Sequence, residues 1–451
     1  MTGNMSTTIE TLSPELLSEI FWHCVHDHPN VMHVPRRAPL MLGRICSRWR
    51  AISISTPGLW STIVIGRHPA SISVNNRKDL DAAIVWVNRS GTRPLTFCIN
   101  ELGNPSEGYG SDLRQVLEFV VSQSRRWGKL LVTLPSQFMD MLLVPLMEGN
   151  TPNLEDIQSQ SILYGDIEGF GSWSFVLSST PHLKRLKFFG APINIDFGEQ
   201  IHRVQTIEIG SQPHGKFSLL DLLQCLLQCP SLIKLGHHIK KSSPAATLQH
   251  ALPNVIALTN LRYLTLTFSA TVDPYLVFDR LYLPSITSLR LSMSQCTQTD
   301  WPYLASMLKR SPSLLAVLHL QGVPMTERTL IECLSLTPKL EQLSLDGINC
   351  SDITLSALTI DDNENVNSAI LCPYLSNVDF GPPCLFSPHA FKAMVFSRWS
   401  SDQTSDDITL TPGRPSLPRQ WFELVVMGRR ISGPRVRLDH GPCGNIAAGG
   451  V

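Results

Sequence analysis

The chain has 451 residues, and its 37 Lys plus Arg balance 37 Asp plus Glu, so the formal net charge at pH 7 is zero. Nucleic-acid binding usually requires a clustered basic surface, because phosphate neutralisation supplies much of the affinity, and this balance predicts no nucleic-acid partner. Only 16% of residues are charged, below the ~25% of an average soluble domain, whereas the 43% that are hydrophobic suffice for a large core.

No segment predicts a signal peptide or a membrane span. Residues 1–11 are polar, and the most apolar run, Met139 to Met147, is short and contains Pro145. We therefore expect no membrane association and a soluble protein of the cytoplasm or nucleus. The eleven cysteines are irregularly spaced and include no Cys-x-x-Cys pair, which predicts buried free thiols in a reducing compartment.

Residues 12–26 predict a short amphipathic helix. Ser13 is suited to cap it, and Pro14 is suited to the first helical position. The residues that follow form an apolar stripe at helical spacing: Leu16, Leu17, Ile20 and Phe21.

Residues 40–54 predict a second helix, followed by a compact apolar segment at 59–63. One side of this helix carries Leu42, Ile45, Cys46 and Trp49. The chain's one basic cluster lies in or just before it, at Arg36, Arg37, Arg44, Arg48 and Arg50. These arginines either attract an acidic partner surface or form an ordinary solvated helix face.

A repeated strand signature follows. It has three apolar positions, with two residues between the first and the second and one residue between the second and the third. Its first positions are Trp127, Leu154, Leu183, Val204, Leu232, Leu261, Ile286, Leu315, Leu340 and Leu375. From Leu154 onward most intervals lie in or near the ~20–29 residues of a leucine-rich repeat. A further strand is expected at 95–99.

Helical patterns occupy several of the gaps between these strands. They cover residues 80–89, 116–124, 219–228, 303–309, 329–336 and 389–399. Strands alternating with helices predict an α/β fold in which parallel strands line one face of a leucine-rich-repeat-like solenoid.

Three blocks of the N-terminal region resemble the F-box motif, most closely the F-box-like form abundant in fungi. The first is Leu12-Ser13-Pro14-Glu15-Leu16-Leu17 with Ile20-Phe21, the second Ile45-Cys46-Ser47-Arg48-Trp49-Arg50, and the third Pro57-x-Leu59-Trp60. The resemblance covers about residues 12–63, and the loop from His26 to Pro39 is longer than in a compact F-box. The segment from Trp86 to Leu95 also resembles the one that follows the F-box in this family.

The resemblance implies a small helical F-box at 10–65, a linker at 66–79, a substrate-recognition repeat domain at 80–400 and an irregular cap or tail at 401–451. It also implies a Skp-type adaptor as partner, and through it a cullin–RING scaffold, with the repeats holding an unknown target protein for ubiquitin transfer. The residues matching positions that pack within an F-box or touch the adaptor are Leu12, Pro14, Leu16, Leu17, Ile20, Phe21, Leu42, Ile45, Cys46, Trp49, Leu59 and Trp60.

The register of the predicted strands selects candidate target-binding residues. Apolar positions point into the core, and the side chains between them line the opposite face. The polar positions are Arg185, Lys187, Tyr263, Thr265, Ser288, Arg290, His319 and Gln342, followed by Ser344, Asn377 and Asp379. We favour Tyr263 and Arg290, because Tyr and Arg are enriched in interface hot spots.

No catalytic signature accompanies these features. Nucleotide-phosphate loops and the Gly-x-Ser-x-Gly nucleophile motif are absent, so we expect neither an enzyme nor a cofactor. A zinc site at His23, Cys24 and His26 is conceivable from the helical spacing, but we expect no metal because these residues fall in the helix assigned to packing. Two alternatives stay open: an F-box scaffold that acts outside ubiquitin transfer, and an enzyme without a recognised motif.

Overall fold

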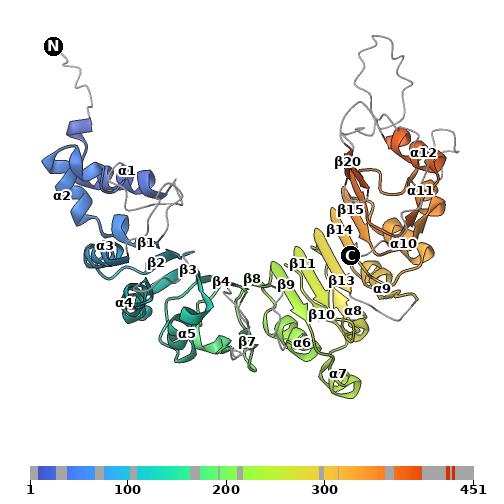
Figure 1. Ribbon diagram of the computed structural model, residues 1–451, viewed down its shortest axis with the longest axis horizontal. Coiled ribbons are helices and arrows are strands. Elements are labelled where there is room, and N and C mark those ends of the chain that lie inside the picture. The colour runs from blue at the N-terminus through green and yellow to red at the C-terminus, as the bar shows by residue number, and fades with distance from the viewer. Residues whose placement is uncertain are drawn as a thin grey trace, which may run out of the picture. The chain divides into compact units, whose positions relative to one another are not determined.

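A computed structural model describes most of the chain. The described residues are 9–26, 38–66, 76–101, 109–162, 173–190, 193–210, 217–293, 299–312, 314–360 and 370–398, together with the backbone of 423–426 and 429–431. They form two compact units, Met1–Leu283 and Pro284–Val451. Both contain parallel strands alternating with helices, which confirms the predicted α/β class (Figure 1).

The first unit begins with an N-terminal helical segment, residues 9–60. It comprises η1 (Ile9–Thr11), α1 (Pro14–His26), η2 (Leu42–Arg44), α2 (Ser47–Ser55) and η3 (Pro57–Trp60), where η denotes a 3₁₀-helix. Ser13 caps α1 as predicted, since its Oγ accepts a hydrogen bond from the amide of Leu16 at 3.4 Å.

The single helix predicted at 40–54 is wrong, because the chain breaks between η2 and α2. Cys46 has an extended backbone (φ −153°, ψ 170°) and acts as the N-cap of α2. Its Sγ accepts a hydrogen bond from the amide of Trp49 at 3.4 Å. The apolar spacing continues through this break, so periodicity alone could not reveal it.

Large apolar side chains hold the N-terminal helical segment together. Leu17, Phe21 and Leu59 are completely buried. The rings of Phe21 and Trp49 lie 4.9 Å apart between centroids, which joins α1 to α2. Trp60 is also buried, and its Nε1 donates to the carbonyl of Ser53 at 2.7 Å, so the polar end of this indole is satisfied inside the core.

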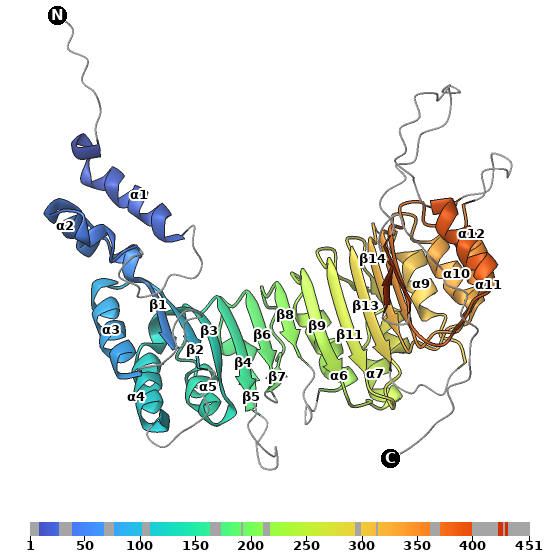
Figure 2. The same cartoon turned by 45° about the horizontal axis from the view of Figure 1, so that its top comes forward.

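A parallel sheet forms the body of the first unit, and its strands appear side by side in Figure 2. In spatial order they are β1 (Thr62–Gly66), β2 (Leu95–Asn100), β3 (Trp127–Pro135), β4 (Asp156–Ile162), β6 (Arg185–Phe189), β8 (Thr206–Ile209), β9 (Lys234–Ile239) and β11 (Tyr263–Phe268). All but β1 coincide with segments that the sequence predicted as strands.

Helices lie along one side of this sheet, most visibly α3 to α6 in Figure 1. The helices are α3 (Asn76–Arg89), α4 (Tyr109–Ser122), α5 (Met139–Met147), α6 (Leu219–Gln228), α7 (Ala245–Ala251) and α8 (Tyr275–Phe278), with short 3₁₀ turns η4 (Ser124–Arg126), η5 (Ser136–Phe138) and η6 (Leu177–Ser179). Two small parallel pairs accompany them, β5 (Trp173–Val176) with β7 (Ile193–Asp196) and β10 (Ile256–Ala257) with β12 (Leu281–Tyr282).

The predicted alternation of buried and solvent-facing strand residues is confirmed. In spatial order, Ile63, Phe97, Leu130, Ile157, Leu186, Ile207, Leu235 and Leu264 occupy one register row, and each is at most 2% exposed. These apolar side chains pack beneath the helices. The intervening residues face the other side of the sheet, where strands β4 to β11 carry no helix among the residues that the structure describes.

The N-terminal helical segment continues directly into the sheet. Strand β1 starts two residues after Trp60 and pairs with β2 over five positions. The rings of Trp60 and Trp86 lie 5.2 Å apart, and the guanidinium of Arg89 lies 4.3 Å from the Trp60 ring centroid. Residues 62–65, which the resemblance placed in the helical domain, are therefore part of the sheet.

The second unit repeats the strand–helix alternation. Its sheet contains β13 (Ser288–Met293), β14 (Val317–Gln321), β15 (Gln342–Asp346), β17 (Asn377–Phe380), β19 (Glu423–Val426) and β20 (Arg429–Ile431), parallel except for the last pair. Its helices are α9 (Tyr303–Arg310), α10 (Glu327–Ser335), α11 (Asp352–Leu358) and α12 (Pro388–Arg398). A short pair joins β16 (Cys350–Ser351) to β18 (Cys384–Leu385). Strands β19 and β20 thus lie within the region predicted as an irregular tail.

Candidate interaction surfaces

The N-terminal helical segment exposes an unusual number of large apolar side chains. Two of them, Leu16 and Ile20, are 55% and 41% exposed and lie four residues apart on α1, so they share one face of the helix. Among the described residues of this segment, the exposed large apolar side chains, which we call the N-terminal apolar residues, are Ile9, Leu16, Ile20, Met41, Ile45 and Ile54. Exposed apolar side chains gathered in one small segment are typical of a surface that a partner covers.

The residues that resemble an F-box fall into three classes by exposure: buried, half-buried and exposed. Leu17, Phe21, Leu42, Leu59 and Trp60 are buried, and Leu12 and Trp49 are half-buried. The exposed group is Pro14, Leu16, Ile20, Ile45 and Cys46. The exposed group is accessible to a partner without unfolding the segment.

The basic cluster is partly used within the segment itself. Arg48 donates to the carbonyls of Glu10 and Leu12, and Arg50 donates to the carbonyl of Gly43 at 2.7 Å. These two guanidinium groups therefore fix the N-terminus of α1 and the turn before α2. Arg36 and Arg37 lie outside the described residues.

A second surface is the helix-free side of the first sheet, which we call the strand face. Arg185 and Tyr263 are exposed there, Lys187 is half-buried, and Thr265 is exposed. One register row joins Lys129, Asp156, Arg185, Thr206, Lys234 and Tyr263 on consecutive strands of the sheet. The predicted positions in the first unit therefore lie on one surface.

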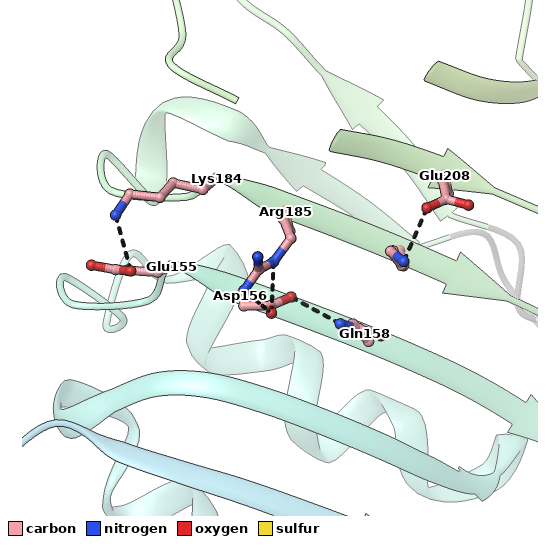
Figure 3. Close-up of polar contacts among 7 residues, drawn as sticks. Glu155, Asp156, Gln158, Lys184, Arg185 and Glu208 are labelled. Carbon is pink, nitrogen blue, oxygen red and sulfur yellow. Dashed lines mark hydrogen bonds and ion pairs between the residues drawn. The ribbon is translucent and has the colours of Figure 1, made fainter. Parts of the chain in front are cut away.

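Ion pairs order this strand face (Figure 3). The Arg185 guanidinium lies 2.8 Å from the Asp156 carboxylate, whose side chain is only 4% exposed. The Glu208 carboxylate is held between two ammonium groups, 3.0 Å from Lys187 Nζ and 2.9 Å from Lys234 Nζ. Burial alone would raise the pKa of Glu208, but the hydrogen bonds and charges of the two lysines outweigh it and lower that pKa.

The strand face of the second unit carries the remaining predicted positions. Arg290 and Gln342 are exposed, and Ser288 and His319 are half-buried. Desolvation and the neighbouring Arg290 lower the pKa of His319, whereas Asp379 and Asp346 act in the opposite direction. Side-chain hydrogen bonds link Ser292 to Gln321 at 3.0 Å and Gln321 to Asp346 at 3.1 Å.

Five of the nine cysteines in the described part of the chain are buried, as predicted. Cys225, Cys229, Cys333, Cys350 and Cys372 are buried, whereas Cys24 and Cys46 are exposed. Burial raises the pKa of Cys333 and Cys350 to about 12, so these thiols stay protonated at neutral pH and lack the thiolate that nucleophilic chemistry needs.

Two residues of the zinc site considered from the sequence, His23 and Cys24, lie on the surface of α1. His23 and Cys24 are exposed, and His23 Nε2 lies 3.5 Å from a Glu19 carboxylate oxygen. His26 is the last residue of α1. Within the described ranges, no group of three or more His, Cys, Asp or Glu side chains is arranged to hold a metal ion.

Sequence reasoning did not find the Asp156–Arg185 pair or the two-lysine arrangement around Glu208. The only signal was that these residues occupy polar positions of neighbouring strands, 29 residues apart for Asp156 and Arg185.

Among the helices that the structure describes, none is long and apolar enough to cross a membrane. A comparison with models of known protein families gives no match. A comparison with curated protein sequences also gives no match.

Proposed function

We propose that this chain is the substrate-recognition subunit of a Skp–cullin–F-box type ubiquitin ligase. In this proposal the N-terminal helical segment is an F-box that binds a Skp-type adaptor, and the strands behind it form a leucine-rich-repeat-like solenoid that holds a target protein. The chain supplies no catalytic residue, and it acts in the cytoplasm or nucleus, where the adaptor and the cullin–RING scaffold would be found.

The exposure of Leu16, Ile20 and Ile45 is the observation that carries the proposal. These residues occupy positions of the F-box-like blocks, yet each is more than 40% exposed. Their neighbours in the same blocks, Leu17 and Phe21, are completely buried. A self-contained helical hairpin would gain stability by covering such side chains, whereas a docking module keeps them for its partner.

The strand faces support the second half of the proposal. Their polar side chains alternate with buried apolar ones along each strand, so they can change without disturbing the core. Tyr263 is 46% exposed in the row that also contains Arg185 and Lys234. A rigid sheet that presents Tyr and Arg side chains is well suited to bind a protein partner.

Coexpression with a Skp-type adaptor and a pulldown test adaptor binding. The triple variant Leu16→Ala, Ile20→Ala, Ile45→Ala should lose roughly 3 kcal/mol of binding free energy, or ~100-fold in affinity, because interface anchors each contribute about 1 kcal/mol or more. The matched control is Ile201→Ala with Val255→Ala, which removes side chains that are 65% and 55% exposed elsewhere in the first unit. Undiminished binding by the triple variant would refute the adaptor assignment.

Affinity purification followed by mass spectrometry distinguishes a ligase subunit from a scaffold that acts outside ubiquitin transfer. A ligase subunit should copurify with the adaptor, a cullin and the target together. Recovery of the adaptor without any cullin would instead favour a scaffold that acts outside ubiquitin transfer.

A further inference from the structure

The strand face of the first unit carries an excess of positive charge. Within strands β3 to β9 it presents Lys129, Arg185, Lys187 and Lys234 against the carboxylates of Asp156 and Glu208, an excess of two positive charges. The row of this face that lies beyond Lys187 contains Asn100, Thr133, Gln160 and Phe189, and these residues add no charged side chain. The chain as a whole has zero formal net charge, so this excess is a local feature.

Three of these cations recur at a regular interval. Lys129 on β3, Arg185 on β6 and Lys234 on β9 lie in one register row, and each is separated from the next by one strand, β4 or β8. We call them the cationic row. Neighbouring strands lie about 4.8 Å apart, so the backbones of consecutive residues of the row are about 9.6 Å apart.

We propose that the cationic row binds an extended acidic segment of the target protein, with acidic residues at every third position. A polyproline II segment rises about 3.1 Å per residue with three residues per turn, so residues i, i+3 and i+6 share one face at about 9.3 Å intervals. That interval matches the spacing of the strands that carry the cationic row. The inference rests on the proposed function, because it names the chemistry of the target that the repeats hold.

The row is accessible and already ordered. The side chains of Arg185 and Lys234 are 48% and 42% exposed, and Lys129 is exposed. Asp156 fixes the Arg185 guanidinium, and Glu208 fixes the Lys234 ammonium, so neither side chain has to be immobilised from a disordered state when an acidic segment binds. Two lysines share the single Glu208 carboxylate, which leaves them able to attract a further anionic group.

Three labelled peptides test the proposal by fluorescence anisotropy on the full chain at low ionic strength. They are fluorescein-(Glu-Pro-Pro)₃, its (Gln-Pro-Pro)₃ counterpart, and a peptide of the first composition with its three Glu residues adjacent. The first should bind, more weakly as salt rises, and the other two should bind substantially less. Equal binding of the Gln peptide or of the clustered peptide would overturn the proposal.

Charge variants on the strand face provide the second measurement. Lys129→Gln with Lys234→Gln should lose roughly tenfold in affinity for (Glu-Pro-Pro)₃. Glu208→Gln should instead raise the affinity, by roughly threefold, because it releases two lysines. Lys309→Gln, on helix α9, removes one positive charge away from the strand face and should leave the affinity unchanged. Equal peptide affinity in the wild type and the double variant would overturn the assignment to this row.

Two further measurements separate the competing explanations. A labelled single-stranded oligothymidylate that binds more tightly than the peptide, with the same dependence on Lys129 and Lys234, would overturn the proposal in favour of a nucleic-acid site. Adaptor pulldown on the same variants is expected to be unchanged. A wild-type chain that binds the adaptor but not (Glu-Pro-Pro)₃ would refute only this inference, whereas failure of the wild type to bind any adaptor would refute the proposed function.

Discussion

Leu16 and Leu17 are consecutive residues of α1, yet Leu16 is 55% exposed and Leu17 is completely buried. The two side chains point to different sides of the helix, because successive residues are about 100° apart around its axis. Leu17 belongs to the core with Phe21 and Leu59, whereas Leu16 is free to meet a partner. A variant that replaces both would mix loss of folding with loss of binding.

Substitutions of the two leucines should therefore differ in their effect on the free energy of unfolding. Leu17→Ala should lower the free energy of unfolding by about 2–5 kcal/mol, because it leaves a cavity in the core. Leu16→Ala should change it by about 0.5 kcal/mol or less, as for most surface substitutions. Urea denaturation followed by circular dichroism measures both. Similar destabilisation by the two variants would contradict the exposures of these residues.

Replacement of Trp60 by Phe should weaken the attachment of η3 to α2 within the N-terminal helical segment. The Nε1 hydrogen bond to the carbonyl of Ser53 is lost, which leaves that buried oxygen without its donor and costs about 1–3 kcal/mol. Trp49→Phe is the control, because Trp49 is half-buried and its ring contact with Phe21 can be kept by another ring. Equal unfolding midpoints for W60F and the wild type would show that this bond contributes nothing.

His237 should make the first unit sensitive to acid. Its ring stacks on Phe217 with centroids 3.5 Å apart, and burial lowers its pKa to about 3. An unfolded histidine titrates near 6.5, so between about pH 6.5 and 3 the unfolded chain binds a proton that the folded chain does not. Stability from this group is complete above pH 6.5 and falls as the pH decreases through that window.

His237→Phe preserves an aromatic ring against Phe217 and removes the titrating group. Its unfolding free energy should therefore fall less steeply than that of the wild type between pH 6.5 and 4. Denaturant titrations at half-unit pH steps, with pH 8 as the reference, measure the two slopes. Parallel profiles for the variant and the wild type would assign the acid sensitivity to other groups.

Arg398 should be essential to the end of the second unit. Arg398 is 4% exposed, and its guanidinium donates to three backbone carbonyls, those of Leu358 at 2.6 Å, Leu371 at 2.7 Å and Cys372 at 2.9 Å. Burial lowers the pKa of Arg398 to about 10, so the side chain remains charged at neutral pH. It thereby ties helix α12 to the end of α11 and to the turn before β17.

Arg398→Met should destabilise this region by about 2–4 kcal/mol, because three carbonyl groups lose their donors. Arg398→Lys should restore little, since one compact ammonium group cannot reproduce the planar fork of a guanidinium. Hydrogen exchange should then increase in α11 and α12 and stay unchanged in the first unit. Full protection in the lysine variant would show that charge alone, and not the three-way geometry, holds α12.

Cleavage between Gly66 and Asn76, where the sequence places a polar junction with Pro69, should not release the N-terminal helical segment. Strand β1 would remain paired with β2 over five residues, and Trp60 would remain packed against Trp86. A protease site inserted there should give two fragments that migrate together in size-exclusion chromatography and separate only in denaturant. Separation under native conditions would mean that the segment is an independent domain followed by a linker, as the resemblance implies.

The sequence by itself determined most strands of the two long sheets and most of the described helices. Apolar residues at a spacing of two along Leu186 to Phe188, or along Leu343 to Leu345, specify which side of a strand is buried, because alternate side chains point to opposite faces of a sheet. Helix α6 begins and ends where its pattern predicts, at Leu219 and Gln228, helped by the capping box of Ser218 and Asp221.

Only the tertiary structure decided the break at Cys46, the helix α5 around Pro145 and the short pairs such as β16 with β18. Two-residue strands carry too few positions to show a period, and the break preserves the apolar spacing on both sides. The tertiary structure also decided which N-terminal apolar residues stay exposed, and that Lys187 and Lys234 converge on Glu208. Such relationships join strands that are tens of residues apart, and local periodicity contains no information about which side chains meet across them.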